Sequence, residues 1–169
     1  RVRVDANPTP NIGDLFGVPL VQAGAGVTIP IDFSRVRDFN DLLNVRYFLT
    51  SAKEQKPGDA VYQDKDWKVY ENPSGYPRAW TVHETMVEPS AARAVERISG
   101  TGFDARRTAV IDTPMTLEPL AGGAQETALV SSFAPNRMEL NVDVQSRGLL
   151  VLSENYYPGW RATVDGQTA

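Results

Sequence analysis

The stretch MELNVDV at residues 138–144 decides the fold class, because its apolar and polar side chains alternate without a break. On an extended chain the four apolar side chains face one way and the three polar ones face the other. This period of two is typical of a strand that buries one face and leaves the other in water. After a turn, LLVL at residues 149–152 is apolar on both faces, so we expect a central strand there. Strands at this spacing predict an antiparallel β-sandwich.

Upstream of the sandwich, strand patterns alternate with two short helices. Ser34 is a good N-cap for a first helix, and Asn44 can close it before a strand at residues 45–50. A hairpin is expected at residues 61–70, around the turn Asp64-Lys65-Asp66.

A strand, a helix and a second strand follow one another over residues 79–111. The strand pattern AWTVH at residues 79–83 precedes a helical apolar repeat, and TAVI at residues 108–111 follows it. Pro89 suits the first turn of that helix, where its missing N–H costs nothing, and Gly100 suits its C-cap. The segment therefore predicts a βαβ crossover.

Together these patterns predict a mainly β protein with minor α (α+β): an antiparallel β-sandwich with two short helices and a βαβ segment at residues 79–111. We expect one domain over residues 1–169, with a mixed α/β portion at 1–125 and a β-sandwich portion at 126–169. Asp165-Gly166 predicts a hairpin turn, since glycine tolerates a positive φ. Only three residues follow that turn, so we expect the sandwich portion to be truncated at its C-terminus and the chain to be a fragment of a longer protein.

Composition excludes several classes of function. The chain has 169 residues, no cysteine, one histidine and a net charge of −4. The acidic balance argues against a nucleic-acid partner, which would need a basic face. The lack of cysteine and the single histidine exclude thiolate and multi-histidine metal sites, and no cofactor motif is present: Gly24-Ala25-Gly26 lacks the third glycine of a dinucleotide fingerprint. We therefore expect no cofactor.

Candidate catalytic residues are few. His83 is the only imidazole, and no nucleophile-elbow pattern surrounds any serine, so we expect His83 to be a polar residue at the rim of a strand. Asp64 and Asp66 lack the rest of a calcium loop and predict a solvated turn. Four carboxylates offer an acid–base pair only if the fold brings two of them together. They are Glu71, Glu84, Glu154 and Asp165.

The aromatic turn YYPGW at residues 156–160 is the most unusual local feature. The flat faces of Tyr156, Tyr157 and Trp160 suit stacking on a sugar ring or on the apolar patch of a partner. The alternative is that Tyr156 and Trp160 close one end of the sandwich core, and sequence reasoning favours this structural role.

Several segments resemble a known family. They are LLNVRYFLT at 42–50, VYEN at 69–72, YPRAW at 76–80 and GLLVLSENYYPGWRATVDG at 148–166. A weaker similarity covers PNIG at 10–13 and LFG at 15–17. In order and rough spacing these segments are similar to those of the YfhO-like family of bacterial polytopic membrane proteins.

The resemblance implies a membrane-embedded glycosyltransferase that uses lipid-linked sugars to modify polymers of the cell envelope. Its catalytic acidic residue is expected in an early extracytoplasmic loop, and no position here matches that motif, so no catalytic residue is assigned. This chain would be the soluble region near the C-terminus, on the extracytoplasmic face of the bacterial cell membrane, ahead of a last membrane helix.

We therefore expect an accessory domain that binds or orients an envelope glycan or a lipid-linked sugar acceptor, with the membrane reached through the rest of the parent chain. The polar strand ends and the aromatic turn are the expected contacts. The ligand-binding candidates are Tyr156, Tyr157, Trp160, Glu154, Arg78 and Arg46, with Asn44 and Glu71 as further polar strand ends.

Three alternatives remain open at this point. Arg46, Arg78 and Glu154 would instead form a buried ion-pair network that ties the sheets together. The domain as a whole would instead be a structural or interaction module with no ligand or catalytic activity. A free-standing secreted hydrolase is the third alternative, and the single histidine makes it the weakest.

Overall fold

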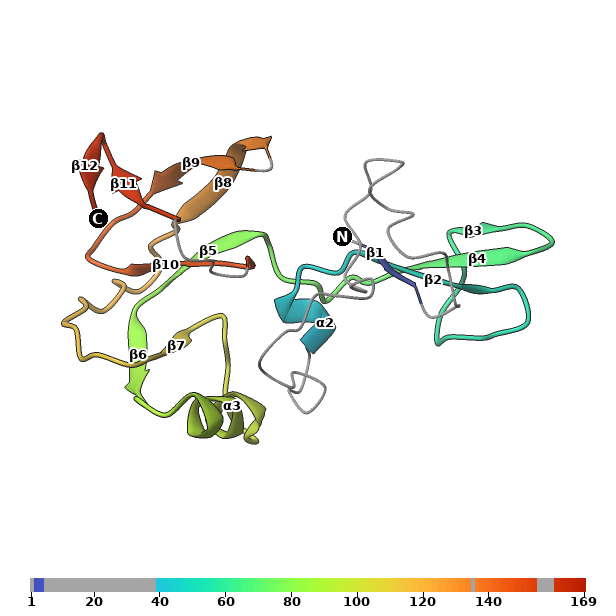
Figure 1. Ribbon diagram of the computed structural model, residues 1–169, viewed down its shortest axis with the longest axis horizontal. Coiled ribbons are helices and arrows are strands. Elements are labelled where there is room, and N and C mark those ends of the chain that lie inside the picture. Colours follow the sequence, from blue (N-terminus) through green and yellow to red (C-terminus); the bar gives the residue numbers. More distant parts are fainter. Residues whose placement is uncertain (1, 5–38, 135, 155–159) are drawn as a thin grey trace.

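The computed structural model describes residues 2–4, 39–134, 136–154 and 160–169 (Figure 1). In this part the protein is mainly β with two short helices, as the sequence predicts. The helices are α2 (Phe39–Leu42) and α3 (Ala91–Ser99). The strands are β1 (Val2–Val4), β2 (Tyr47–Ser51), β3 (Tyr62–Gln63), β4 (Trp67–Glu71), β5 (Ala79–Val82), β6 (Glu84–Val87), β7 (Thr108–Ile111), β8 (Thr127–Ala134), β9 (Arg137–Asp143), β10 (Leu149–Leu152), β11 (Thr163–Val164) and β12 (Gln167–Thr168).

A four-stranded sheet in the order β1-β2-β4-β3 extends to one side of the molecule (Figure 1). Strand β4 pairs antiparallel with both β2 and β3, and β1 runs parallel to β2. The β3–β4 turn forms as expected, because Asp64 Oδ1 accepts hydrogen bonds from the N–H groups of Asp66 (2.8 Å) and Trp67 (2.7 Å). These bonds lower the pKa of Asp64. The two aspartates therefore make a solvated turn.

A network of side-chain amides joins helix α2 to the turn after β4. Asn44 closes the helix with a left-handed φ of 55°, and its amide donates to the carbonyl of Tyr76. Asn72 Nδ2 donates to Asp41 Oδ1 (2.7 Å) and to the Val45 carbonyl (2.9 Å). We call these residues the amide network. The predicted closing role of Asn44 is confirmed, while the predicted N-cap Ser34 lies outside the described residues.

The βαβ crossover forms, with parallel strands β6 and β7 and helix α3 between them. Its first strand is β6 and not the predicted 79–83 strand, because β5 pairs with β10 instead. The N-cap of α3 is Ser90, whose Oγ accepts from the Arg93 N–H, so Pro89 lies just outside the helix. Gly100 is the C-cap, as predicted.

The predicted sandwich portion contains the antiparallel pairs β8–β9 and β11–β12, and β10 pairs with β5. Met138, Leu140 and Val142 lie opposite apolar residues of β8, and the predicted alternation of burial holds at Met138 and Leu140. It ends there, because Val142 and Val144 are 40% and 49% exposed. A bulge between Val130 and Ser132 restores the register and places Phe133 opposite Met138. The predicted turn at residues 165–166 is also confirmed, with φ values of 50° and 80°.

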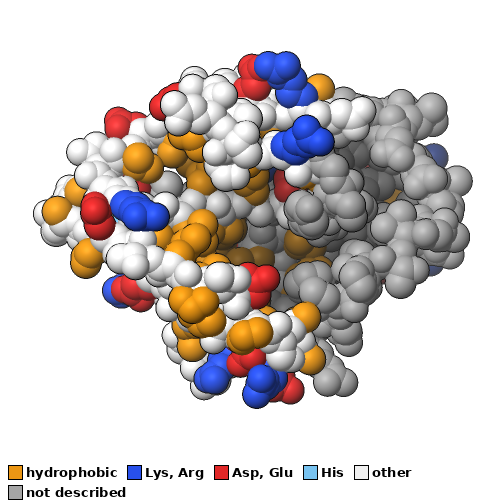
Figure 2. All heavy atoms as spheres, turned by 60° about the vertical axis from the view of Figure 1, so that its left-hand side comes forward, with side chains coloured by type: hydrophobic (Ala, Val, Ile, Leu, Met, Phe, Trp, Pro, Cys, Tyr) orange, Lys and Arg blue, Asp and Glu red, His pale blue; other side chains and the backbone are white. Residues whose placement is uncertain are grey.

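One strand prediction is wrong. Among the described strands β10 has a single neighbour, so it is an edge and not a central strand. Leu150 and Leu152 are accordingly 36% and 38% exposed. Figure 2 shows hydrophobic side chains gathered in a hollow at about the height of β5 and β10, with charged side chains around its rim.

The buried apolar residues of the described part lie in β4, at both ends of β5 and just before β2. They are Val45, Tyr70, Ala79 and Val82. Within the described residues, no helix combines the length and the apolar character that crossing a bilayer requires.

Candidate functional site

A pocket of about 540 Å³ opens where β5 passes into β6. It is lined by residues 81–84, by Arg106 and Arg107, and by the loop at 119–124. Its volume lies within the range of small-molecule sites in proteins. We call it the His83 pocket, after the single imidazole in its wall.

His83 follows directly on Val82, the last residue of β5, so it lies at the end of a strand as expected, but its side chain is only 9% exposed. Its Nδ1 lies 2.7 Å from the Glu118 carbonyl oxygen and its Nε2 lies 3.0 Å from Glu126 Oε2. A carbonyl and a carboxylate both accept hydrogen bonds, so each ring nitrogen must carry a proton to satisfy its partner. The two contacts therefore favour the imidazolium form of His83, and the hydrogen bond to Glu126 raises its pKa above the ordinary value.

Glu126 is the counter-ion, with a side chain that is only 3% exposed. Burial by itself would raise the pKa of this carboxyl group. Hydrogen bonds from Thr81, from His83 and from the Gln145 N–H (2.8 Å) outweigh burial and lower the pKa to about 2. Glu126 is therefore ionised near neutral pH, and its negative charge favours the charged form of His83.

His83 holds both ends of the pocket loop at once. The loop leaves Glu118 and returns at Glu126, and these are the two hydrogen-bond partners of the ring. The Glu118 N–H also donates to the Arg147 carbonyl (2.8 Å), which ties the loop to the β9–β10 turn. We call His83, Glu118 and Glu126 the His83 clamp. Gly148 leaves room for it, because a Cβ there would lie 2.7 Å from His83 Cε1.

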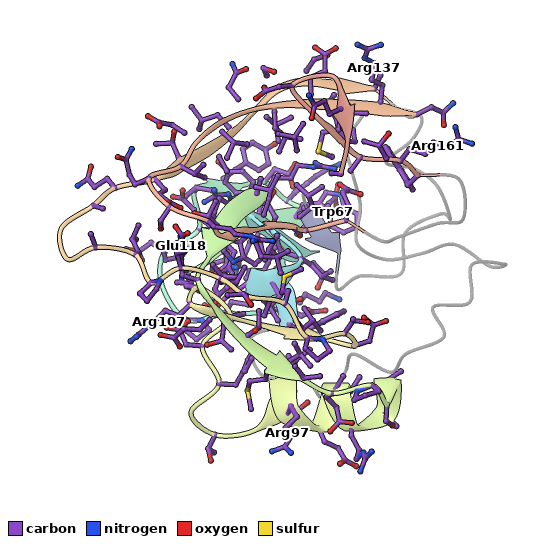
Figure 3. All side chains as sticks on the ribbon, turned by 90° about the vertical axis from the view of Figure 1, so that its left-hand side faces the viewer. Trp67, Arg97, Arg107, Glu118, Arg137 and Arg161 are labelled. Carbon is purple, nitrogen blue, oxygen red and sulfur yellow. The ribbon has the colours of Figure 1, made fainter. Side chains whose placement is uncertain are left out.

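Two arginines line the pocket beside β7. The guanidinium of Arg106 lies 4.0 Å from the ring centroid of Tyr76, and its Nη2 donates to the Ser74 carbonyl (3.0 Å). Arg107 Nη2 pairs with Glu84 Oε1 at 2.9 Å. Figure 3 shows Arg107 and Glu118 on the same side of the molecule. Both arginines therefore contribute to this wall of the pocket, while the Arg106 guanidinium is held by Tyr76 and Ser74, which lie outside the lining.

The site does not have the geometry of a serine hydrolase. Ser146 Oγ lies 3.4 Å from His83 Nδ1, and Glu126 lies at the other nitrogen, so a serine, a histidine and a carboxylate do meet. The Nδ1 proton is directed to the Glu118 carbonyl, however, so Nδ1 has no lone pair with which to deprotonate Ser146. Among the described residues, no group of three or more metal-ligating side chains comes together either.

The predicted site residues are only partly brought together. Arg78 Nη2 pairs with Glu154 Oε1, and the Arg78 guanidinium lies 4.1 Å from the Phe133 ring centroid. Arg46 is exposed, and no ion pair joins it to Arg78 or Glu154 within the described part. The predicted ion-pair network is therefore a pair, and Arg46 is not a member of it.

The other predicted contacts divide into three kinds. Trp160 is 40% exposed. Tyr156 and Tyr157 lie outside the described residues. Asn44 is buried in the amide network, so its side chain is not available to a ligand, whereas Glu71 is exposed.

Glu118, Glu126, Arg106 and Arg107 were not predicted as site residues. Glu126 lies 43 positions from His83 and Glu118 lies 35, so no local spacing connects them. Two signals pointed to this region: the adjacent arginines at 106 and 107, and the glycine pair at 122 and 123 in a loop.

Comparison with protein-family models, with curated proteins and with solved structures finds no match to this chain. Membership of the YfhO-like family therefore stays a prediction from sequence motifs. The functional proposal below depends on those motifs and on the geometry of the His83 pocket.

Proposed function

We propose that this chain is an accessory, non-catalytic domain of a membrane glycosyltransferase-like protein of the YfhO-like type. It acts on the extracytoplasmic face of the bacterial cell membrane, where it binds or orients a glycan or a lipid-linked acceptor. The rest of the parent chain supplies the membrane anchor and the catalytic residue.

The observation that carries the proposal is the His83 pocket with its saturated imidazolium. The cavity has the volume of a small-molecule site. The only histidine of the chain uses both ring nitrogens in the clamp, so the pocket has no free imidazole base. The hydrogen-bond donors that remain for a ligand are those of the arginines in the lining. A pocket of this kind supports a role in binding and positioning a ligand and not in catalysis.

The composition of the pocket also suits a sugar. Polar groups at Glu84, Arg106 and Arg107 offer hydrogen bonds to hydroxyls, while Pro119 and Leu120 offer apolar contacts for the C–H faces of a ring. The half-exposed Trp160 gives a second surface on which a ring can stack.

The experiment is a titration of the chain with neutral and acidic monosaccharides and disaccharides, followed by isothermal calorimetry. Gly122→Trp is the blocking variant, since Gly122 lines the pocket and nothing lies within 4 Å of a Cβ there. Gln125→Trp, in the same loop but outside the pocket lining, is the matched control. We expect saturable binding that Gly122→Trp abolishes and Gln125→Trp retains.

The competing function is a structural or interaction module without ligand affinity. The exposed apolar side chains of β10 favour it, because Leu150 and Leu152 form part of a surface that a protein partner can cover. A flat titration with every sugar up to millimolar concentration would support this module and overturn the binding proposal. Saturable binding that Trp160→Ala abolishes and Gly122→Trp retains would move the site to the aromatic turn.

A further inference from the structure

We infer that the His83 pocket selects anionic saccharides, whose carboxylate or phosphate group is held by Arg106 and Arg107. This inference rests on the proposed carbohydrate-binding function and specifies its ligand. Four features of the pocket carry it.

The first feature is that Arg106 is fixed in place before any ligand arrives. Its guanidinium stacks on Tyr76, and Tyr76 in turn meets Trp80 edge-on at 5.4 Å between ring centroids. The indole Nε1 of Trp80 donates to the carbonyl of Ala105, the residue directly before Arg106 (2.8 Å). Tyr76 and Trp80 therefore hold both the guanidinium of Arg106 and the backbone beside it. A guanidinium held in this way loses little freedom when it binds an anion.

The second feature is that Arg106 has no carboxylate partner among the described residues. Its side chain spends one hydrogen bond on the Ser74 carbonyl, and a guanidinium has five N–H donors. The remaining donors form a planar fork that fits two oxygens of a carboxylate or phosphate. The charge of Arg106 is therefore available to a ligand.

The third feature is that Arg107 can change partner at low cost. Its ion pair with Glu84 is exposed, with side chains 71% and 56% accessible, and such pairs contribute little to stability. Glu84 Oε2 also accepts from Thr108 Oγ1 (3.2 Å), so Glu84 keeps a donor when Arg107 turns toward a ligand. Two adjacent guanidinium groups can then share one anion.

The fourth feature is the charge of the lining, which is opposite in sign to that of the chain. Among the lining residues, the guanidinium groups of Arg106 and Arg107 stand against the single carboxylate of Glu84, and Glu126 balances the charge of His83. The Glu118 carboxylate lies outside the lining and accepts from the Arg147 N–H (3.2 Å). The chain as a whole carries a net charge of −4. The positive lining is thus a local arrangement, which attracts an anion and disfavours a cation.

The test compares three ligands of one sugar: glucose, glucuronic acid and glucose 6-phosphate, each titrated calorimetrically into the whole chain. We expect both acidic sugars to bind at least about tenfold more tightly than glucose, and added salt to reduce that preference. The two acids distinguish the source of the negative charge: tighter binding of glucuronic acid indicates a uronic acid ligand, and tighter binding of the 6-phosphate indicates a phosphorylated sugar.

Arg106→Gln should remove the preference for the acidic sugars over glucose, because glutamine keeps a hydrogen-bond donor but carries no charge. Arg107→Gln, at an exposed position, is the second variant if Arg106→Gln fails to fold. Arg137→Gln is the matched control, because Arg137 also forms an exposed ion pair, with Glu139, at a distant end of the molecule (Figure 3). This control should keep the full preference.

The outcomes separate the two proposals. Equal affinity for all three sugars, or an acidic preference that both arginine variants retain, would overturn the anionic selection and leave the carbohydrate-binding function standing. Inorganic phosphate bound as tightly as glucose 6-phosphate would show an anion site without sugar recognition. No binding of any ligand would overturn both proposals.

Discussion

Two regions of the described fold join segments that are far apart in the sequence, and they do so with different side chains. Near α2 and β4, the Asn72 side-chain amide joins segments about 30 positions apart, with one hydrogen bond to the Asp41 carboxylate and one to the Val45 carbonyl. Beside β5, the His83 imidazole joins segments 35 and 43 positions apart. An asparagine amide has no proton to gain or lose, whereas the clamp is an ion pair only while both His83 and Glu126 are ionised. The charged clamp is also the one that borders the pocket.

The largest expected effect comes from removing one charge of the clamp. Glu126→Gln keeps the size of the side chain but leaves the His83 imidazolium without a counter-ion in a buried site. We expect a loss of about 3–5 kcal/mol in the free energy of unfolding, measured by urea denaturation at about pH 5.5. Glu84→Gln, which breaks an exposed ion pair, is the control and should cost less than about 1 kcal/mol. Equal losses in both variants would show that burial of the clamp has no energetic consequence.

The next largest effect is expected in the amide network. Asn72→Ala removes donors to Asp41 and Val45 and an acceptor for Ser74. Because the Val45 carbonyl is left without its buried partner, we expect a loss of about 2–3 kcal/mol. The loss should be the same at about pH 5.5 and about pH 8.5, in contrast to that of Glu126→Gln. Asn141→Ala, on the exposed face of β9, is the control and should be close to neutral. A loss in Asn72→Ala that changes with pH would remove the distinction between the two regions.

Both regions also show which parts of the fold could be predicted. The β3–β4 turn and the turn at residues 165–166 follow from local chemistry: an aspartate that accepts from nearby N–H groups, and a glycine with a positive φ. The alternation of residues 138–144 predicted β9, and the helical repeat predicted α3. These signals depend on neighbours within a few residues, so the sequence displays them.

Long-range pairings were not predictable in the same way. Leu149–Leu152 is apolar on both faces, which is typical of a central strand, but among the described strands it pairs with β5 alone and so lies at an edge. Likewise, nothing beside His83 in the sequence indicates that its ring will form a hydrogen bond with Glu126. The pocket arises from that pairing and from the loop it holds, so the sequence could suggest arginines and glycines without placing them together.

A smaller effect compares the glycine packed against each region. A Cβ at Gly75 would lie 2.6 Å from the Val45 carbonyl oxygen, and one at Gly148 would lie 2.7 Å from the His83 ring. We expect Gly75→Ala and Gly148→Ala to cost about 1–3 kcal/mol each in urea denaturation, because the neighbours must shift. Gly122→Ala, with open space around its Cβ, is the control and should change stability by less than about 0.5 kcal/mol. A neutral Gly148→Ala would mean that the imidazole can move without loss of the clamp.

The smallest effect is the change of stability with pH in the unmodified chain, and its sign follows from the clamp. The pKa of His83 is raised above 6.5 in the folded state, so its contribution is complete below pH 6.5 and is lost as the pH rises through the folded pKa. The pKa of Glu126 is lowered from 4.5 to about 2, so its contribution is complete above pH 4.5 and is lost as the pH falls toward 2.

The two contributions overlap between pH 4.5 and 6.5, where we expect the clamp to stabilise the fold most. Urea midpoints should therefore fall from about pH 6 to about pH 9 in the unmodified chain and in Asn72→Ala. His83→Gln should flatten this slope, because a glutamine in place of the imidazole has no proton to lose. If the urea midpoint of His83→Gln still falls with pH, the pH-sensitive group lies elsewhere. The His83 clamp would then be as insensitive to pH as the amide network.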